Sequence, residues 1–199
     1  MLIEYKTMDG PVSFPKGLTV MPVNMNAKQS AHEKARVDIH PWMIRRDMAQ
    51  ILAIEEQSFE FPWPEEEFDR CRNKLNCLSM VSECREKIVG YMVYKCHNNY
   101  IALLNVAVHP EMKGRRIGEQ MVEKLKSKLS SERHRKIIIK VRETNLGAQL
   151  FFREMGFKAI SLLRDYYDVT EEDAYVMQYH YSQKSVIENR KMKKMRRTA

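Results

Sequence analysis

The sequence lacks long apolar runs and is poor in cysteine. No stretch of its 199 residues approaches the roughly 18 uninterrupted apolar residues that a membrane-spanning helix needs. The first ten residues, MLIEYKTMDG, lack the basic-then-apolar order of a secretory signal peptide. The four cysteines match no Cys-x-x-Cys metal pair. We therefore expect a cytoplasmic protein with reduced, partly buried thiols, no metal site and no membrane association.

The bulk composition sets the size of the core but not the function. Hydrophobic residues make up 44% of the chain, which is enough to bury one sizeable core but hardly two. The formal net charge is +8. A basic chain of this kind suits an anionic cofactor, a nucleic-acid-rich partner, or solubility alone. The position of the charge therefore matters more than its total.

The two ends of the chain differ from its middle. Residues 1–35 hold several prolines and glycines without a sustained helical period, which predicts an extended or disordered arm. Residues 183–199 are rich in Lys and Arg and have almost nothing to bury, which predicts a disordered basic tail. This tail is either a solvated end or a weak contact to RNA or the ribosome through phosphate neutralisation. A single domain is expected over residues 36–182.

Within this domain, apolar periodicity predicts a mixed α/β fold with a central sheet. Two prolines end the first helix near Phe59, and Asn145 and Gly156 are suited to cap and to end the last helix. Helices are expected over residues 47–56, 65–74, 117–129 and 145–155, and strands over 37–40, 78–82, 88–95, 101–108, 136–142 and 175–181.

The most informative segment runs from an apolar strand into a glycine- and arginine-bearing loop. Residues 103–108 form the strand, Pro110 ends it, and residues 113–118 open an amphipathic helix. Backbone N–H groups and the positive end of a helix suit a pyrophosphate. On the residues alone, the basic side chains of this loop are equally well explained as a solvated surface run.

Two motifs resemble those of the GNAT acetyltransferase superfamily. Residues 113–118, Lys-Gly-Arg-Arg-Ile-Gly, resemble its acetyl-CoA loop, Gln/Arg-x-x-Gly-x-Gly/Ala. Arg116 stands where the family has a glycine, at a position that can require a positive φ or a close approach to phosphate. Residues 145–157 are similar to the family's Asn-x-x-Ala-x-x-Leu-Tyr-x-x-x-Gly-Phe segment, with Phe152 in place of the tyrosine.

Further landmarks resemble one branch, the ribosomal-protein alanine N-acetyltransferases. They lie at residues 54–63, 88–91, 104–108, 141–145 and 164–167, and the resemblance covers roughly residues 37–181. It implies a GNAT fold: a central, twisted, mostly antiparallel sheet with a splayed parallel strand pair and flanking helices. It also implies acetyl-CoA as the cofactor and a protein N-terminus, possibly that of a ribosomal protein, as the acceptor. We expect a monomer or weak dimer.

The resemblance assigns residues to the site. The strand backbone would pair with pantetheine, the loop would wrap the pyrophosphate, and Asn145 would contact pantetheine or help to splay the strands. Implied cofactor-binding residues are Val106, Ala107, Val108, Lys113, Gly114, Arg115, Arg116, Ile117, Gly118, Glu119, Asn145 and Phe152. Implied acceptor-binding residues are Glu56, Phe61, Trp63, Asn105 and Tyr167, with exposed helical glutamates or packed aromatic residues as the structural alternative.

The branch's catalytic pair is missing. Phe152 stands where the branch has a proton-donating tyrosine, and Lys140 stands where it has a glutamate or histidine that helps to deprotonate the amine. Tyr166, Tyr167 and Lys140 are the remaining catalytic candidates. Lys140 would act as a base if its ammonium were desolvated, whereas an ion pair with Glu143 is the favoured structural alternative. Packing at the edge of a hairpin is the alternative for the tyrosines.

The absence of the catalytic tyrosine and base affects which amine can serve as the acceptor. An α-amine has a pKa of roughly 7.7–8.0 and needs little help to lose its proton, whereas a lysine amine has a pKa of about 10.4. We therefore expect an N-terminal α-amine as the acceptor. The competing hypotheses are a catalytically weak or silent acyl-CoA-binding protein and a ribosome-associated factor.

Overall fold

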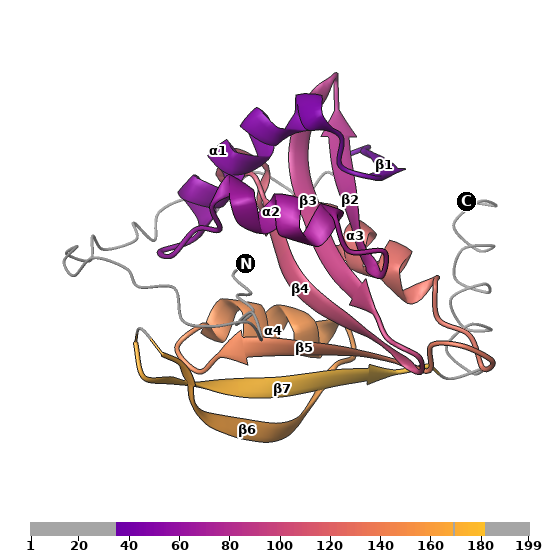
Figure 1. Ribbon diagram of the computed structural model, residues 1–199, viewed down its shortest axis with the longest axis vertical. Coiled ribbons are helices and arrows are strands. Elements are labelled where there is room, and N and C mark those ends of the chain that lie inside the picture. Colours follow the sequence, from indigo (N-terminus) through magenta and orange to yellow (C-terminus); the bar gives the residue numbers. More distant parts are fainter. Residues whose placement is uncertain (1–34, 169, 182–199) are drawn as a thin grey trace.

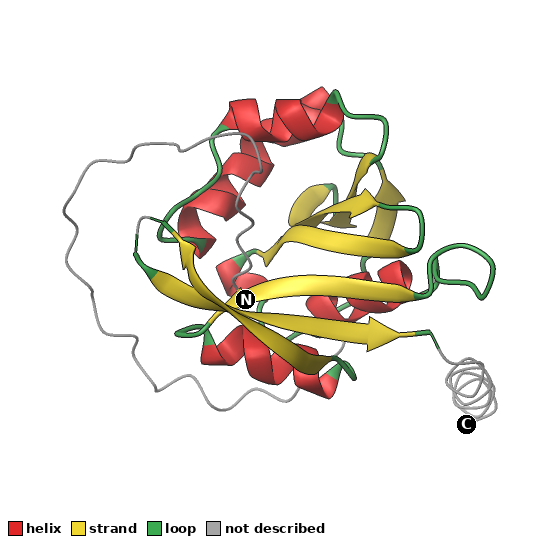
Figure 2. Ribbon diagram, turned by 60° about the horizontal axis from the view of Figure 1, so that its bottom comes forward, coloured by secondary structure: helices red, strands yellow, loops and turns green. Residues whose placement is uncertain are grey.

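Seven strands in one sheet, with helices on both faces, make up the part of the chain that the computed structural model describes, residues 35–168 and 170–181 (Figures 1 and 2). The strands are β1 (Asp38–Pro41), β2 (Cys77–Cys84), β3 (Lys87–Cys96), β4 (Tyr100–Val108), β5 (Lys136–Arg142), β6 (Lys158–Tyr167) and β7 (Glu172–His180). The helices are α1 (Met48–Ser58), α2 (Glu65–Arg72), α3 (Ile117–Lys126) and α4 (Leu146–Glu154), with 3-10 turns η1 (Arg45–Asp47) and η2 (Pro110–Met112).

The strand order is β1-β2-β3-β4-β5-β7-β6. Every pairing is antiparallel except that of β4 with β5, which is parallel. The expected mixed α/β fold, with one parallel pair in a mostly antiparallel sheet, is confirmed. The predicted arm, apart from Ala35, and the predicted basic tail lie outside the described residues.

Two apolar cores lie on opposite faces of the sheet. On one face, α3 and α4 pack Met121, Leu125 and Phe152 against the central strands. On the other, α1 and α2 contribute Ile54 and Phe68 to the second core. Each such side chain stabilises the fold by about 1.5–3 kcal/mol when it leaves water. Because both faces are covered, β4 is buried along almost its whole length, and its sequence is nearly continuously apolar.

The predicted elements agree with the observed ones to within a few residues, with one omission. Strand β6 was not predicted. It is an edge strand whose residues are mostly exposed, so polar residues such as Lys158, Ser161 and Arg164 hide the alternation that marks a strand. The predicted end of the last helix is confirmed by the left-handed Gly156, with φ 82°.

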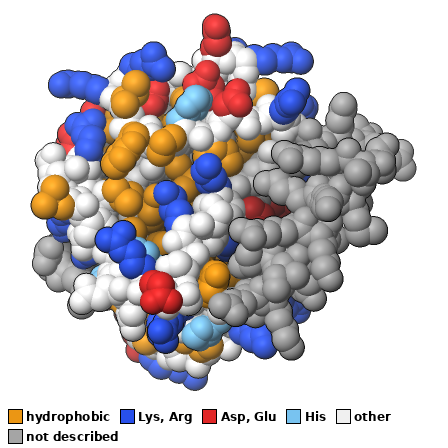
Figure 3. Space-filling model, turned by 90° about the vertical axis from the view of Figure 1, so that its right-hand side faces the viewer, with side chains coloured by type: hydrophobic (Ala, Val, Ile, Leu, Met, Phe, Trp, Pro, Cys, Tyr) orange, Lys and Arg blue, Asp and Glu red, His pale blue; other side chains and the backbone are white. Residues whose placement is uncertain are grey.

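Figure 3 shows Lys and Arg side chains scattered among apolar and acidic residues on one face of the molecule. Among the described helices, none is long and apolar enough to cross a membrane.

Candidate functional site

The parallel strands β4 and β5 part from one another halfway along. Their paired register runs from Tyr100 opposite Lys136 to Leu103 opposite Ile139 and then ends, although β4 continues to Val108 and β5 to Arg142. Figure 1 shows the two strands diverging from their common start. The edge of β4 that faces β5 therefore has backbone groups past Leu103 that β5 does not pair. An extended ligand with amide groups can bind such an edge.

A bulge in β4 lies where the strands separate. Val93 is opposite Asn105 whereas Tyr94 is opposite Leu103, so Leu104 is the extra residue. The bulge turns Asn105 towards α1, where its Nδ2 donates to Glu55 Oε1 at 3.1 Å. Tyr91 Oη donates to Asn105 Oδ1 at 3.4 Å. Asn105, which the resemblance places at the acceptor, is completely buried in this network.

Glu55 connects three parts of the fold. Its side chain is 0% exposed, and Oε1 accepts from the backbone N–H of Trp63 at 2.8 Å as well as from Asn105. The carboxyl group thereby fixes the loop between α1 and α2 against the bulge in β4. Glu56, which the resemblance places at the acceptor, faces solvent on α1. Trp63 is only 8% exposed and packs edge-on against Phe68, so it supports the loop from within the core.

The loop before α3 has the backbone that its sequence suggested. Arg116 is the N-cap of α3 and is left-handed, with φ 59° and ψ 21°, and Gly114 has φ 79°. The expectation of a positive φ at the family's glycine position is confirmed. No side chain caps α3 at its N-cap residue. The first-turn N–H groups, from Ile117 to Glu119, have no partner within the helix and point where an anion is favoured.

Side chains around this loop are basic and exposed. Lys113, Arg115 and Arg116 all face solvent, and Arg116 forms an ion pair with Glu119 at 2.7 Å. Ala35 braces the loop from outside: its N–H donates to the carbonyl of Arg115 at 3.2 Å, and its carbonyl accepts from Gln120 Nε2 at 3.1 Å. The sequence carried no signal of this contact, because the two segments are far apart along the chain.

Lys140 lies on β5, one residue beyond Ile139, the last residue of β5 that pairs with β4. Burial alternates along β5, so Lys140 and Arg142 point away from the core beneath α3 and α4. Lys140 Nζ donates to Tyr166 Oη at 2.9 Å, and burial lowers the pKa of its ammonium. The expected ion pair with Glu143 does not form among the described residues. Glu143 Oε1 accepts from the backbone N–H of Asp173 instead.

Arg142, on the same face of β5 as Lys140, contacts both the loop between α1 and α2 and the hairpin of β6 and β7. Its guanidinium lies 4.0 Å from the ring centre of Tyr167 and 5.3 Å from that of Phe61. It also donates to Thr170 Oγ1 at 2.7 Å and pairs with Glu172. The loop between α1 and α2 and the hairpin of β6 and β7 are therefore linked through one side chain. Sequence reasoning did not find this role.

The carboxylate of Glu172 is stabilised in this cluster. Burial tends to raise its pKa, but hydrogen bonds from Thr144, Arg142 and Thr170 outweigh that effect and lower it. Glu172 Oε1 accepts from Thr144 at 2.6 Å, and Oε2 accepts from Thr170 at 2.9 Å. The ion pair is consequently maintained at neutral pH.

Phe152 and Asn145 have structural roles. Phe152 is 0% exposed and packs edge-on against Phe151 and Phe157, each with ring centres 5.1 Å apart. The resemblance places Phe152 at the cofactor, and in the structure its ring belongs to the core. Asn145 Oδ1 accepts from the N–H of Ala148 at 3.0 Å, which confirms the predicted helix cap.

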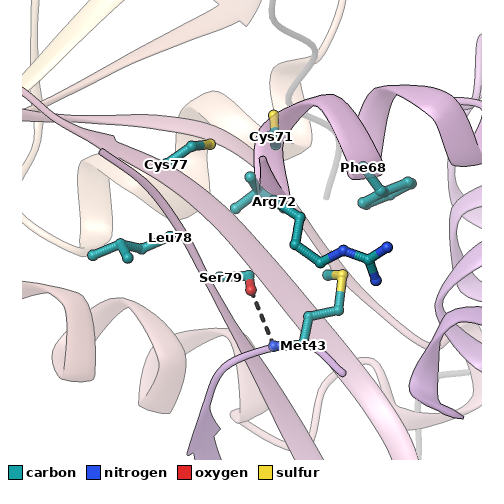
Figure 4. A pocket seen from close by; sticks show the side chains of 8 residues that line it. Met43, Phe68, Cys71, Arg72, Cys77, Leu78 and Ser79 are labelled. Atoms are coloured by element: carbon teal, nitrogen blue, oxygen red, sulfur yellow. Dashed lines mark hydrogen bonds between the residues drawn. The ribbon is translucent and has the colours of Figure 1, made fainter. Parts of the chain in front are cut away.

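A small pocket between α2 and β2 lies apart from these groups (Figure 4). Its lining includes Cys71, Cys77 and Ser79, and Ser79 Oγ accepts from the N–H of Met43 at 3.0 Å. All four cysteines are free thiols, as expected. Within the described residues, no three His, Cys, Asp or Glu side chains are placed to hold a metal.

Comparison with known proteins identifies the architecture. Residues 48–157 match the model of the acetyltransferase (GNAT) family. The [ribosomal protein bS18]-alanine N-acetyltransferase of Escherichia coli K12 is 25% identical over 133 residues, which cover 66% of this chain and 89% of that protein. The crystal structure of the Escherichia coli ribosomal-protein-S18-alanine N-acetyltransferase superposes with a TM-score of 0.66 at 23% identity, over 74% of this chain and 96% of the other. The crystal structure of Arabidopsis thaliana NAA60 in complex with acetyl-CoA superposes with a TM-score of 0.64 at 16% identity, over 73% of this chain and 98% of the other.

Proposed function

Because the chain belongs to the GNAT acetyltransferase family, we propose that it transfers the acetyl group of acetyl-CoA to the α-amine of a protein N-terminus. The observation that carries the proposal is the parting of β4 from β5, followed in the chain by the left-handed loop that opens α3. Together they offer an unpaired strand edge to an amide-bearing arm and a helix N-terminus to a diphosphate.

The residues present fit acetyl-CoA. Gly114 is open above its backbone, since a Cβ there would meet nothing within 4 Å. We assign the diphosphate to the N–H groups of residues 114–119, with Lys113 and Arg115 supplying positive charge, and the pantetheine arm to the backbone of residues 106–108. Asn145 is assigned to holding α4 beside the parted strands. When bound, acetyl-CoA supplies a thioester whose thiolate is a fair leaving group.

The chain's own contribution is then positional and electrostatic. Strand N–H groups near Val106 would donate to the thioester oxygen and stabilise the negative charge that develops on it. Holding the two reactants together supplies a large share of the rate enhancement even without general acid–base help, which is typically worth about 10² to 10⁴ in rate. Lys140, Tyr166 and Tyr167 are the groups that we place nearest to the proton chemistry.

The acceptor would enter between the loop that carries Phe61 and the hairpin that carries Tyr167. Both rings flank Arg142, so the walls are pre-ordered. Glu56, exposed on α1, would attract the ammonium at the entrance, whereas Trp63 and Asn105 would shape the groove from within. The ammonium of Lys140 in this face disfavours a second cation, which adds to the preference for an α-amine over a lysine side chain.

The substrate class follows from proton affinity. On the order of a tenth of an α-amine is neutral at pH 7, whereas a lysine amine would need its pKa lowered by about three units. The Escherichia coli relative is named for an alanine of ribosomal protein bS18. We propose a ribosomal-protein N-terminus as the acceptor of this chain as well, in the cytoplasm.

A second candidate is a weakly active or silent acyl-CoA-binding protein. The observation that favours it is Phe152, which fills the place of the branch's tyrosine and is sealed in the core without a hydroxyl. This candidate predicts binding of CoA with no turnover of any amine.

The test is to mix the protein with acetyl-CoA and short peptides that have free N-termini and to follow the released thiol. Mass spectrometry then locates the acetyl group. The expected product carries it on the α-nitrogen. Binding of CoA in a calorimeter without thiol release from any peptide would support the second candidate instead, and the absence of both would overturn the cofactor assignment.

A further inference from the structure

Two loops lie side by side at the end of the sheet where β4 and β5 begin. The turn between β3 and β4 spans residues 97–99, and the loop between α3 and β5 spans residues 127–135. The N–H of Arg135 donates to the carbonyl of Asn99 at 3.0 Å and joins the two loops (Figure 1). Because β4 and β5 part at their other ends, these loops lie at the opposite end of β4 from the loop that opens α3.

The longer loop is held in shape by its own hydrogen bonds. Ser130 Oγ accepts from the N–H of Arg133 at 3.1 Å, and the N–H of Ser130 donates to the carbonyl of His134 at 3.0 Å. Arg135 Nε donates to the carbonyl of Ser131 at 2.9 Å. The loop therefore presents its outward side chains from a defined backbone.

Basic side chains gather around these two loops. The set, which we call the basic end, consists of Lys95, Lys128, Arg133, Arg135 and Lys136. Lys128 Nζ lies 5.7 Å from the ring centre of Tyr94, and Lys136 Nζ lies 6.0 Å from that of Tyr100. Lys128, Arg133 and Arg135 are exposed, whereas Lys95 and Lys136 are half-buried.

Two neighbouring groups respond to this charge. Burial raises the pKa of the Cys96 thiol, and the charges of Lys128 and Arg133 act against that rise. Burial also lowers the pKa of His97, and the charge of Lys95 lowers it further. Cations from β3, from the end of α3 and from the following loop therefore converge on the same turn.

Little negative charge offsets the basic end. Within the described residues, none of its members forms an ion pair with a carboxylate. Glu132 is the one acidic residue of the two loops; it is exposed and accepts from Ser131 Oγ at 2.9 Å. Glu123, on α3, pairs with Lys126 at 2.9 Å. Like charges without partners repel one another, so stability alone does not explain this arrangement.

The chain continues from the basic end into its basic tail. The N–H of Tyr181 donates to the carbonyl of Arg135 at 2.7 Å, so the residues that follow start beside the loops. In the sequence, residues 183–199 hold seven Lys or Arg residues and one acidic residue, Glu188. The positive charge is therefore continuous along the chain from the described surface onwards.

We propose that the basic end binds the phosphate backbone of a nucleic acid, with Lys128, Arg133 and Arg135 as its main contacts. A nucleic acid carries one negative charge per nucleotide at a regular spacing, which suits a group of unpaired cations that continues into a basic tail. Asn98 and Asn99, exposed at the turn, add neutral donors of the kind that bind phosphate oxygens.

A lipid surface fits the basic end less well. Among the described residues, none of the exposed large apolar side chains belongs to the two loops. Anchoring on lipid uses an apolar face beside the basic one. Leu75 is exposed on the loop before β2, whose Asn76 carbonyl accepts from the N–H of Cys96, but one leucine is worth only about 1.5–3 kcal/mol of burial.

The first test follows the salt dependence of binding. A fluorescent single-stranded RNA of mixed sequence is titrated with the full chain at several KCl concentrations, and its anisotropy gives the affinity. We expect a Kd of about 10⁻⁶ to 10⁻⁴ M at physiological salt. Each phosphate contact contributes about 0.7 to the slope of log K against log salt, so the double variant Lys128→Gln, Arg133→Gln should lower the slope by about 1.4.

The matched control removes the same two charge types elsewhere. Arg85 and Lys87 are exposed at the turn between β2 and β3, at the opposite end of β3 from Lys95. The double variant Arg85→Gln, Lys87→Gln should keep the slope of the unaltered protein. Equal slopes in the Lys128, Arg133 variant and the unaltered protein would overturn the proposal, because the tail would then bind without the loops.

A second variant predicts a gain, which misfolding does not produce. Glu132→Gln removes the acidic residue between the proposed contacts, so we expect RNA to bind several-fold more tightly at low salt and the advantage to shrink as salt rises. Unchanged or weaker binding by Glu132→Gln would count against the loops as the binding surface.

Other polyanions serve as competitors. DNA of the same sequence should bind within a few-fold of RNA, since the contacts are to the backbone. Poly-glutamate at equal charge concentration should displace little RNA, and vesicles of phosphatidylserine and phosphatidylcholine should retain less protein than RNA does. Full displacement by poly-glutamate, or tighter binding to the vesicles, would overturn the choice of partner.

This proposal stands apart from the proposed acetyl transfer. The basic end lies away from the parted strands, so the Lys128, Arg133 variant should acetylate a free peptide at the unaltered rate. A chain that binds RNA as described but acetylates no amine would leave this proposal in place and refute the proposed function alone.

Discussion

Two adjacent glutamates on α1 should respond very differently to removal. Glu55 is 0% exposed and accepts from Trp63 N–H at 2.8 Å and from Asn105 Nδ2 at 3.1 Å. In Glu55→Ala both donors lose their acceptor in a buried place, and each such loss costs about 1–3 kcal/mol. We therefore expect Glu55→Ala to lower the free energy of unfolding by about 2–6 kcal/mol. For a domain of this size that corresponds to a fall in Tm on the order of 10 °C.

The matched control is Glu56→Ala, which changes the same residue type one position along on the exposed side of α1. A surface change of this kind should stay within about 0.5 kcal/mol. Urea unfolding followed by circular dichroism measures both variants, and Glu55→Gln, which retains an acceptor oxygen, should fall between them. Equal, small effects of Glu55→Ala and Glu56→Ala would refute the network that ties α1 to the bulge in β4.

Three further changes test other parts of the structure. Arg116→Gly should raise Tm because glycine adopts the left-handed conformation without strain, whereas Arg115→Gly should lower it; a fall in both would contradict the backbone assignment. The pKa of Glu172 is lowered in the folded protein, so its carboxylate stabilises the fold fully above the pKa of the unfolded chain, and this stabilisation is lost as the pH falls through the lower folded pKa. Glu172→Gln should therefore weaken the fall of the free energy of unfolding at acid pH, and an unchanged acid dependence would count against the cluster. Phe152→Tyr places a hydroxyl in a buried apolar site and should lower the free energy of unfolding, measured in urea, by about 1–3 kcal/mol. An unchanged free energy of unfolding would show that the ring faces an open groove.

The elements with clear periodicity were predictable from the sequence. The helical spacing of Ile117, Met121 and Leu125 predicted the buried face of α3, and the alternation from Lys136 to Arg142 predicted β5 with its observed ends. Strand β6 was missed because an edge strand with mostly exposed side chains has no apolar alternation. The left-handed backbone of Arg116 was predictable because a glycine is usual there in the family.

The partners within the site could not be predicted. Helical spacing from Ile51 and Ile54 puts Glu55 on the buried face of α1, but its contact with Asn105 depends on the bulge at Leu104, which sets the side of β4 that Asn105 faces. The partner of Lys140 is Tyr166, which lies 26 residues further along the chain. Their contact depends likewise on an irregularity in the pairing of β6 with β7, between Leu163 and Tyr167. Registers of this kind are decided by tertiary packing, and spacing along the sequence carries little information about them.

The central claim is acetyl transfer to an α-amine at the parted strands. The most direct measurement compares two peptides of one sequence with acetyl-CoA: one with a free N-terminus and no lysine, the other with a blocked N-terminus and one lysine. The account predicts thiol release and an acetylated α-nitrogen with the first peptide and little or none with the second. Preferential acetylation of the lysine peptide, or binding of acetyl-CoA without transfer to either peptide, would contradict it.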